Sequence, residues 1–508
     1  MGPSRASRKC GQPACLECFV VPRTSRALVA GVDSSTQSTK VELRDIDSGV
    51  LVARATAPHP PTSPPVSEQH PESWWVALVE CFAQLSSSSR DVVAISVAGQ
   101  QHGLVLLDDS GMPLRPAKLW NDTTSASQTE RLVSEYGAAS WVEACGSVPV
   151  PSFTVTKLAW VVEHEPELAD RIAQIMLPHD YLTWRLTGRH VTDRGDASGT
   201  GWFDPRANVY REDMLERAGI ADGAAAQSWL PEVLAADAAA GEVSDEAASL
   251  LGLGSGVVVG PGSGDNMGAA LGLALSPGDV VISLGTSGTV YSVSLTATTD
   301  ESGAVAGFAD ASGKFLPLVC TLNATKVTDT VARWLGVDAA GLSALALAAP
   351  PTAVPPVLIP YFDGERTPNL PAASGLFAGL RNDTSPEDLA LAAHDGVLCG
   401  LLSGFDALAA AGVDTSGRLL LIGGGSRSAA YRQRAADLRN APVTVPHDDE
   451  TVAVGAAVQA AAISTASPLG VVAQAWNLGA GLSVDPATDA TNARDRYGVT
   501  ASLAGQIQ

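Results

Sequence analysis

The sequence predicts an α/β protein of two large domains. Its 508 residues exceed what one hydrophobic core usually organises. Short apolar strand patterns alternate with helical patterns along most of the chain. A strand, turn and strand pattern with a hydroxyl-containing tip occurs early in each half, at residues 27–46 and 279–294. This recurrence indicates a duplicated architecture.

Composition limits the partners that we expect. The formal charge of -22 and the pI near 4.7 argue against nucleic acid or an anionic membrane surface, and favour a cytosolic role with a small molecule. Proline and arginine interrupt the long apolar runs, so no membrane span is predicted. Phe19 to Val21 is too short for the core of a signal peptide. Seven cysteines, an odd number, indicate reduced thiols.

Residues 1–26 are predicted to form a disordered extension, and a start codon placed too early is the alternative. Cys10, Cys15 and Cys18 have a spacing known from iron-sulfur ligands. The fourth cysteine and the accompanying glycines are missing, so a metal site is not favoured.

Residues 27–58 read as three strands joined by short turns, ALVAGVD, TKVELRDI and LVARATAP. The first strand is buried, ends at Asp33 and is followed by a hydroxyl-rich turn that includes Thr36. Backbone N–H groups and hydroxyls of such a turn can surround a phosphate. An Asx-type turn that only closes a hairpin is the alternative.

Residues 72–85 show apolar side chains at helical spacing, and the buried strand VVAISVAG follows at 92–99. That strand runs into Gln100, Gln101 and His102, whose amide and imidazole groups can hydrogen-bond the hydroxyls of a sugar. A histidine with only a structural role is the alternative. A second aromatic and polar cluster follows at Trp120, Asn121 and Asp122.

The middle of the chain alternates helix and loop patterns. KLAWVVEH, at 157–164, reads as a helix and VTDRGDASGTGWFD, at 191–204, as a polar loop. Asp193 and Asp196 could form a paired-carboxylate site, but solvated turn acids are the commoner case. The alanine-rich residues 224–248 are predicted to form a surface helix and a connection.

The stretch GPGSGDNMGAALG, residues 260–272, changes from a strand through a glycine turn to a helix and places Asp265 at the helix start. An N-cap is the simplest role for that aspartate. A helix N-terminus stabilises a carboxylate anion, so we expect Asp265 to be ionised and its basicity to be lowered.

The second half begins with strand DVVISLG, a turn at 285–288 and strand TVYSVS, whose tip can close around phosphate oxygens. Two such hairpins suggest a nucleotide held between the two copies. Strand RLLLIG then runs into Gly423, Gly424 and Gly425, where bare backbone leaves room for an adenine. A long helix is predicted at 386–411, and a strand and a helix to residue 462 finish the unit. The motifs of P-loop NTPases and protein kinases are missing.

The order of these segments resembles the FGGY family of carbohydrate kinases over about residues 27–462. AGQQHG at 98–103, WND at 120–122, GDN at 264–266, SLGTSG at 283–288 and LIGGGSRS at 421–428 carry the resemblance. The family's first signature, with a lysine and a tryptophan, is matched by SFTVTKLAWVVEH at 152–164. Gln101 departs from the family's usual methionine, and His394 from an apolar residue in the second signature.

The resemblance implies two actin-like (ribonuclease H-like) domains with mixed sheets flanked by helices and the nucleotide in the cleft between them. We expect an N-terminal domain at 27–275, which binds the sugar and carries the catalytic base. A nucleotide-binding C-terminal domain at 276–480 and a tail at 481–508 follow.

The resemblance also implies a role for each matched residue. Asp265 is the implied general base, and Asp33 lies near Mg²⁺, through water. The implied sugar contacts are Gln101, His102, Asp265 and Asn266, and the implied ATP contacts are Thr36, Gly285, Thr286, Gly424 and Gly425.

The implied activity is the ATP-dependent phosphorylation of D-xylulose to D-xylulose 5-phosphate, in the catabolism of xylose in the cytoplasm. A homodimer is compatible with the resemblance, which does not fix the oligomeric state. One alternative is a kinase of the same family for ribulose, gluconate or glycerol, which Gln101 keeps open. The other is an actin-like ATPase that uses nucleotide as a switch.

Overall fold

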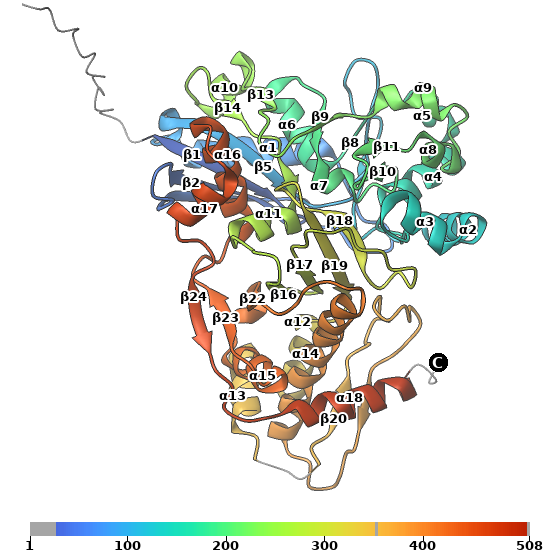
Figure 1. Cartoon of the computed structure of the whole chain (residues 1–508), viewed down its shortest axis with the longest axis vertical. Coiled ribbons are helices and arrows are strands. Elements are labelled where there is room, and N and C mark those ends of the chain that lie inside the picture. The colour runs from blue at the N-terminus through green and yellow to red at the C-terminus, as the bar shows by residue number, and fades with distance from the viewer. Residues whose placement is uncertain (1–26, 351–353, 505–508) are drawn as a thin grey trace, which may run out of the picture.

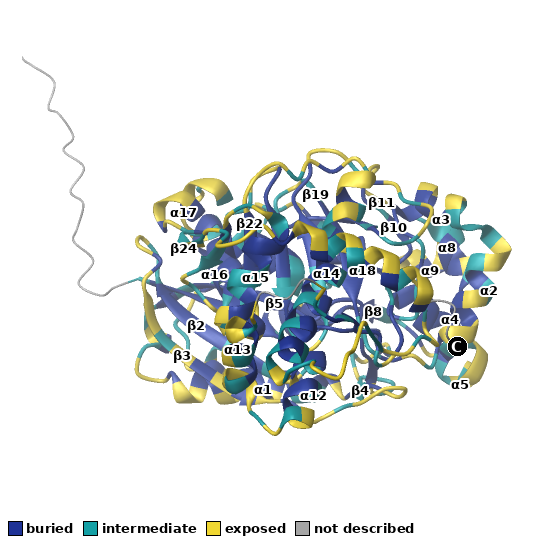
Figure 2. Cartoon of the chain, turned by 90° about the horizontal axis from the view of Figure 1, so that it is seen from below, coloured by how far each residue is buried: buried dark blue, intermediate teal, exposed yellow. Residues whose placement is uncertain are grey.

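The computed structural model describes residues 27–350 and 354–504, so the extension 1–26 with Cys10, Cys15 and Cys18 lies outside the described residues. Figure 1 shows two lobes, each built around one large sheet. Figure 2 shows buried residues on the central strands and exposed residues on the outer helices. The predicted α/β fold with two mixed sheets flanked by helices is confirmed.

The first sheet has seven strands. Its order is β13 (Gly241–Glu242), β14 (Val258–Val259), β5 (Val92–Gly99), β1 (Leu28–Ser34), β2 (Ser38–Asp45) and β3 (Leu51–Pro58), with β15 (Ser263–Gly264) also on β5. The predicted meander β1 to β3 is antiparallel, whereas β5 and β14 run parallel to β1 and to each other. All seven residues of β1 are buried, which agrees with its apolar sequence.

The second sheet repeats this plan. Its order is β18 (Ala306–Ala309), β19 (Phe315–Thr321), β17 (Gly288–Ser292), β16 (Val280–Leu284), β22 (Leu419–Ile422), β23 (Val443–Pro446) and β24 (Gly481–Val484). The meander β16, β17 and β19 is antiparallel, and β22 and β23 continue in parallel from β16. Six strands of each sheet share this order and these directions, which agrees with the predicted duplication, and β15 and β18 are additions to the first and the second sheet.

Shorter elements complete the first half of the chain. Its helices are α1 (Pro71–Gln84), α2 (Ala126–Tyr136), α3 (Ala138–Cys145), α4 (Thr154–His164), α5 (Pro166–Ala169), α6 (Pro178–Thr187), α7 (Arg194–Ala197), α8 (Glu212–Arg217), α9 (Gly223–Ala226), α10 (Asp245–Leu251) and α11 (Asp265–Gly272), with 3₁₀ turns η1 (Ser89–Asp91) and η2 (Gln227–Trp229). Its two-stranded pairs are β4 (Glu68–Gln69) with β7 (Ala117–Lys118), β6 (Val105–Leu107) with β8 (Gln174–Met176), β9 (Val191–Asp193) with β12 (Glu232–Leu234), and β10 (Phe203–Asp204) with β11 (Val209–Tyr210).

The predicted surface helix at 224–248 is wrong. The structure has α9, η2, β12, β13 and α10 there, because Trp229 to Pro231 interrupt the helix and β12 pairs with β9. Alanine content alone did not reveal this break.

The second half adds further helices and one strand pair. They are α12 (Thr325–Leu335), α13 (Ala339–Ala348), α14 (Pro386–Ala410), α15 (Ala429–Arg439), α16 (Thr451–Thr465), α17 (Leu469–Ala475) and α18 (Thr491–Ala504), with 3₁₀ turn η3 (Gly424–Arg427) and the pair β20 (Val357–Ile359) and β21 (Leu376–Ala378). Residues 481–504 of the predicted tail hold β24, which pairs with β23, and α18, which packs on β20, α14 and α15.

Helix α16 comes late in the chain yet packs against β1, β5 and α11 of the first half (Figure 1). A Cβ on Gly31 of β1 would lie 1.9 Å from the Ala453 carbonyl oxygen of α16. Such close approach requires glycine, and it fixes α16 against the first sheet.

Helix α14 is long and apolar enough, by length and composition, to cross a membrane, as are two bent helix pairs among the described residues. The sequence-based expectation that no stretch resembles a span was therefore wrong for α14. Its apolar window is 67% buried, and Val397, Leu401 and Leu402 belong to the core of the second unit. Packing inside the protein accounts for this apolar character.

The four cysteines among the described residues, Cys81, Cys145, Cys320 and Cys399, are free and buried. This agrees with the reduced thiols that the odd cysteine count predicts.

Candidate active site

The hairpin of β1 and β2 places Asp33 opposite Lys40 at the end of the buried strand. Asp33 is buried, and the Ser35 hydroxyl donates a hydrogen bond of 2.5 Å to its Oδ1. Burial raises the pKa of Asp33 to about 6, although the Ser35 bond and the charge of Lys40 act in the opposite direction. The carboxyl group of Asp33 is thus still mostly ionised at pH 7, although its pKa lies closer to neutrality than that of an exposed aspartate.

Thr36 lies at the tip of this hairpin and is held by the polar cluster that follows β5. Its hydroxyl donates to Gln100 Oε1 at 3.0 Å and accepts from Trp120 Nε1 at 2.9 Å. These two bonds connect the predicted phosphate turn with the predicted sugar cluster.

Gln101 follows β5 and reaches the start of α11. Its Oε1 accepts a hydrogen bond of 2.9 Å from Asn266 Nδ2. A Cβ on Gly264 would lie 2.7 Å from Gln101 Cγ, so this contact requires the glycine before Asp265. Gln101 Nε2 is buried without a hydrogen-bond partner among the described residues, which leaves an amide donor for a ligand.

His102 has a neutral imidazole ring, and one of its two nitrogens, Nδ1, is hydrogen-bonded within the protein. Burial lowers its pKa well below the usual value, and the charges of Lys157 and Arg366 lower it further. Nδ1 lies 2.9 Å from the Gly199 carbonyl oxygen, which can only accept, so Nδ1 carries the proton. The ring stacks on Phe153 at a centroid distance of 5.1 Å. Nε2 is therefore the acceptor that His102 can offer to a hydroxyl.

Asp265 is the first residue of α11, and Gly264 is the N-cap, so Asp265 is not the cap itself. The side chain is half-buried. Its Oδ1 accepts from the backbone N–H of Asn266 at 2.8 Å and from Asn266 Nδ2 at 2.9 Å. Among the described residues no hydrogen bond is directed at Oδ2, so this oxygen can take a proton from a bound alcohol.

The expectation of a lowered basicity at Asp265 was wrong. Burial raises its pKa to about 7 and the charge of Asp33 adds to that, which outweighs the bonds from Asn266. A helix N-terminus stabilises an anion by about 0.3–1 kcal/mol at an exposed site, which is less than the cost of burial here. The result is a carboxyl group whose pKa matches general-base work at neutral pH.

This pKa predicts a pH profile. Turnover that needs ionised Asp265 is expected to fall as the pH decreases through about 7, because the carboxyl group takes up a proton there. The measurement is kcat/KM for the phosphate acceptor between pH 5 and pH 9 at saturating nucleotide. A profile flat down to pH 5 would contradict the raised pKa.

The hairpin of β16 and β17 forms the second predicted phosphate turn. The carbonyls of Gly285 and Thr286 accept from the N–H groups of Thr325 at 3.0 Å and Ala324 at 3.2 Å. At the start of β17, the Thr289 hydroxyl donates to Asn266 Oδ1 at 3.3 Å. This bond joins the second unit to the residue beside Asp265, and sequence patterns did not indicate it.

The glycines of the nucleotide turn differ in role. A Cβ on Gly425 would lie 2.7 Å from Leu284 Cβ, so Gly425 is required for packing against β16. At Gly424, in contrast, no atom of residues 27–350 or 354–504 lies within 4 Å of such a Cβ. Bare backbone accessible to a flat group is therefore found at Gly424.

A buried charged cluster underlies the Asp265 turn. His179 Nε2 lies 3.1 Å from Asp180, 3.2 Å from Asp193 and 3.4 Å from Asp196 carboxylate oxygens. Burial alone lowers the pKa of His179, but the carboxylates outweigh it and raise the pKa to about 9. The expectation that Asp193 and Asp196 are solvated turn acids was wrong, because both are buried and Asp193 caps α7.

Comparison with known proteins adds to this geometry. Residues 28–272 match the profile of the "FGGY family of carbohydrate kinases, N-terminal domain", and residues 280–464 match that of its C-terminal domain. The xylulose kinase of Streptomyces coelicolor is 49% identical over 90% of this chain and 92% of its own length. That of Streptomyces rubiginosus is 48% identical over 89% and 92%. The crystal structure of xylulose kinase from Bifidobacterium adolescentis, 39% identical, superposes with a TM-score of 0.80 and covers 94% of this chain and 99% of its own.

Proposed function

The chain belongs to the FGGY family of carbohydrate kinases, and on that premise we propose that it transfers the γ-phosphoryl group of ATP to D-xylulose, giving D-xylulose 5-phosphate. The observation that carries this proposal is the half-buried Asp265, whose pKa is raised to about 7 and whose Oδ2 takes no hydrogen bond from the residues that the structure describes. This carboxylate lies next to Asn266 and Gln101, two side chains suited to bind hydroxyls.

Asp265 acts as the general base. The 5-hydroxyl oxygen of the sugar attacks the γ-phosphorus of ATP, the bond between that phosphorus and the β,γ-bridging oxygen breaks, and Asp265 Oδ2 receives the hydroxyl proton. Phosphoryl transfer passes through a loose transition state, so positioning and charge neutralisation supply most of the rate. A base with a pKa near neutrality suffices.

The sugar contacts follow from the unused hydrogen-bonding groups of the site. Gln101 Nε2 donates to a sugar oxygen, since this nitrogen is buried and has no hydrogen-bond partner in the described part of the chain. His102 Nε2 accepts from a hydroxyl, since Nδ1 is engaged with Gly199. Asn266 is held between Gln101 and Thr289, so its amide is oriented by both units. We assign Gln101, His102, Asp265 and Asn266 to the sugar on this basis.

The nucleotide contacts are assigned to the two hairpins and the glycine turn. Thr36, Gly285 and Thr286 lie at hairpin tips, where backbone and hydroxyl groups can cradle phosphate oxygens. Gly424 supplies bare backbone to the nucleoside, and Gly425 shapes the turn by packing on β16.

Asp33 is the residue that would hold Mg²⁺. Among residues 27–350 and 354–504, no three His, Cys, Asp or Glu side chains are grouped so that they could hold a metal ion. Mg²⁺ keeps several waters and binds substrate phosphates alongside one or two carboxylates, so a carboxylate such as that of Asp33 would be a sufficient protein ligand. The mutual repulsion of Asp33 and Asp265 also favours a cation near both. When bound, Mg²⁺ neutralises phosphate charge.

We place this activity in the cytoplasm and in xylose catabolism. The four cysteines of the described residues are free and buried, which supports a reducing compartment. The homodimer stays a prediction.

The acceptor specificity is tested by ADP release from Mg-ATP with D-xylulose, ribulose, gluconate, glycerol or no sugar. We expect kcat/KM for D-xylulose to exceed the others by a factor on the order of 10², because several hydrogen bonds discriminate together. A preference for another of these acceptors would contradict D-xylulose as the substrate but would be compatible with the proposed phosphoryl-transfer mechanism. ATP hydrolysis at the same rate with and without every sugar would contradict the kinase assignment and would favour an actin-like ATPase that uses nucleotide as a switch.

A further inference from the structure

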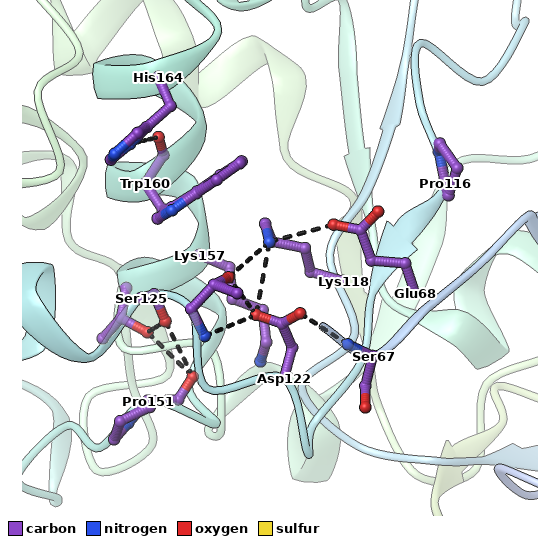
Figure 3. Close-up of polar contacts among 12 residues, drawn as sticks. Ser67, Glu68, Pro116, Lys118, Asp122, Ser125, Pro151, Lys157, Trp160 and His164 are labelled. Atoms are coloured by element: carbon purple, nitrogen blue, oxygen red, sulfur yellow. Dashed lines mark hydrogen bonds and ion pairs between the residues drawn. The ribbon is translucent and has the colours of Figure 1, made fainter. Parts of the chain in front are cut away.

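Helix α4 carries the lysine and tryptophan of the family's first signature, Lys157 and Trp160, and neither takes part in the reaction described above. Lys157 is completely buried. Its Nζ donates to the carbonyl oxygen of Ser152 and, at 3.0 Å, to that of His102. Figure 3 shows Lys157 beside a second lysine, Lys118, in a group of polar side chains.

The burial of Lys157 is not explained by an ion pair. No carboxylate of the described residues lies within ion-pair distance of its Nζ, whereas Lys118 Nζ lies 3.1 Å from Glu68 and 3.4 Å from Asp122. Burial lowers the pKa of Lys157 well below its usual value, and Asp122 opposes this only in part. Burying an amine without a charged partner costs free energy. The hydrogen bonds from Lys157 Nζ to the carbonyl oxygens of Ser152 and His102 offset part of this cost.

One of those carbonyls belongs to a residue in an unusual conformation. His102 has a φ of 65°, in the left-handed region that side chains other than glycine seldom adopt. Two donors from the first turns of α4 hold its carbonyl oxygen, Lys157 Nζ at 3.0 Å and the Thr154 hydroxyl at 3.3 Å. Because the peptide orientation sets the direction of the side chain, these donors also set where the imidazole lies.

We propose that Lys157 is a positioning residue of the sugar site: by holding the His102 carbonyl it keeps His102 in its left-handed conformation and directs Nε2 towards a sugar hydroxyl. The ring is then fixed on its other sides by the Gly199 carbonyl and by Phe153. This inference rests on the proposed sugar-binding role of His102.

The neighbouring lysine provides a matched control. Lys118 is 1% exposed, its Nζ donates to the Thr124 hydroxyl at 2.7 Å, and it lies 3.8 Å from the centroid of the Trp160 ring. It belongs to the same buried group as Lys157 but makes no hydrogen bond to His102 among the described residues. Loss of a buried lysine can thus be separated from loss of the His102 contact.

The test compares Lys157→Met with Lys118→Met. Lys157→Met removes a buried hydrogen bond to the His102 carbonyl oxygen, so we expect it to raise the KM for D-xylulose about tenfold. The KM for ATP is expected to stay within about twofold, because the contact acts on the sugar side. Lys118→Met is expected to lower Tm as Lys157→Met does, with a sugar KM within about twofold of wild type. An equal rise of sugar KM in both variants, or none in Lys157→Met, overturns the proposal.

A double-mutant cycle with His102→Ala gives a readout that a general structural defect does not share. In the His102→Ala background, Lys157→Met is expected to leave the sugar KM unchanged, since the residue that it positions is gone. Additive effects overturn the proposal. Should Lys157→Met fail to fold, Thr154→Val removes the other donor and is expected to raise the sugar KM about threefold. A wild-type enzyme without sugar-dependent turnover would instead refute the proposed function.

Discussion

Asp265→Asn is expected to lower kcat by a factor on the order of 10³, because it removes the group that accepts the hydroxyl proton. The sugar KM is expected to change less than about threefold, since asparagine still fits beside Asn266 and can contact the hydroxyl. Initial rates of ADP release with D-xylulose measure both quantities. A variant with near-normal turnover would remove Asp265 from the role of base.

The same variant has a stability readout with a definite sign. The folded-state pKa of Asp265 is raised to about 7, above the value of about 3.9 for an unfolded aspartate. Ionised Asp265 therefore destabilises the fold progressively as the pH rises from about 4 to about 7. Asp265→Asn is expected to raise Tm at pH 8 and to leave it nearly unchanged at pH 4. Asp237→Asn, at an exposed position that makes no hydrogen bond or ion pair with other described residues, serves as the control and is expected to shift neither Tm nor kcat. A Tm of Asp265→Asn equal to wild type at pH 8 would contradict the raised pKa of Asp265, which burial and the charge of Asp33 produce.

Gly455→Ala is expected to cost about 3 kcal/mol of folding stability, because overpacking at a close contact forces the backbone to shift. A Cβ on Gly455 of α16 would lie 1.9 Å from the Gly268 carbonyl oxygen of α11, and both atoms are fixed by the helices. The usual gain of about 1 kcal/mol for alanine over glycine in a helix does not compensate. Since α11 begins at Asp265, we also expect kcat to fall.

Thermal unfolding measures this loss, and Gly470→Ala in α17 is the matched control. No atom of the described residues lies within 4 Å of a Cβ built on Gly470, so alanine there is expected to be neutral or slightly stabilising. If Gly455→Ala retained the wild-type Tm, the close crossing of α11 and α16 would not be rigid.

The positions of the central strands were largely predictable from sequence because they depend on local patterns. The apolar run at 92–99 and the repeated hairpins required only periodicity and turn residues, and β1, β5, β16 and β17 form there. The partner of α16 was not predictable. Its sequence TVAVGAAVQAAAIST is apolar or small on every side, which indicates burial but not which sheet covers it. We expected it to complete the second unit, whereas it packs on the first sheet.

For the site residues, the positions in the chain were predictable from sequence, whereas protonation and burial were not. Asp265, Gln101 and Asn266 follow strand ends or start a helix, and the structure brings these three together. The protonation state of Asp265 was not predictable, because its pKa depends on burial and on the charge of Asp33. Asp33 lies 232 positions earlier in the chain (265 minus 33). The buried state of Lys157 was also hidden, since a lysine in an amphipathic helix usually reaches solvent. Only the three-dimensional contact with His102 indicates what it does.

The position of α16 against β1 and β5 has a consequence for biosynthesis. The ribosome completes the first sheet at Gly264, the end of β15, whereas α16 begins only at Thr451. The apolar face around Val29 and Ala94, which α16 covers in the folded protein, therefore stays uncovered while nearly 200 further residues (from 264 to 451) are made. Nascent chains that emerge with such an apolar face depend on chaperones or remain incompletely compact. The N-terminal half is accordingly expected not to be obtainable as an independent soluble fragment, unless the segment of α16 is supplied in trans.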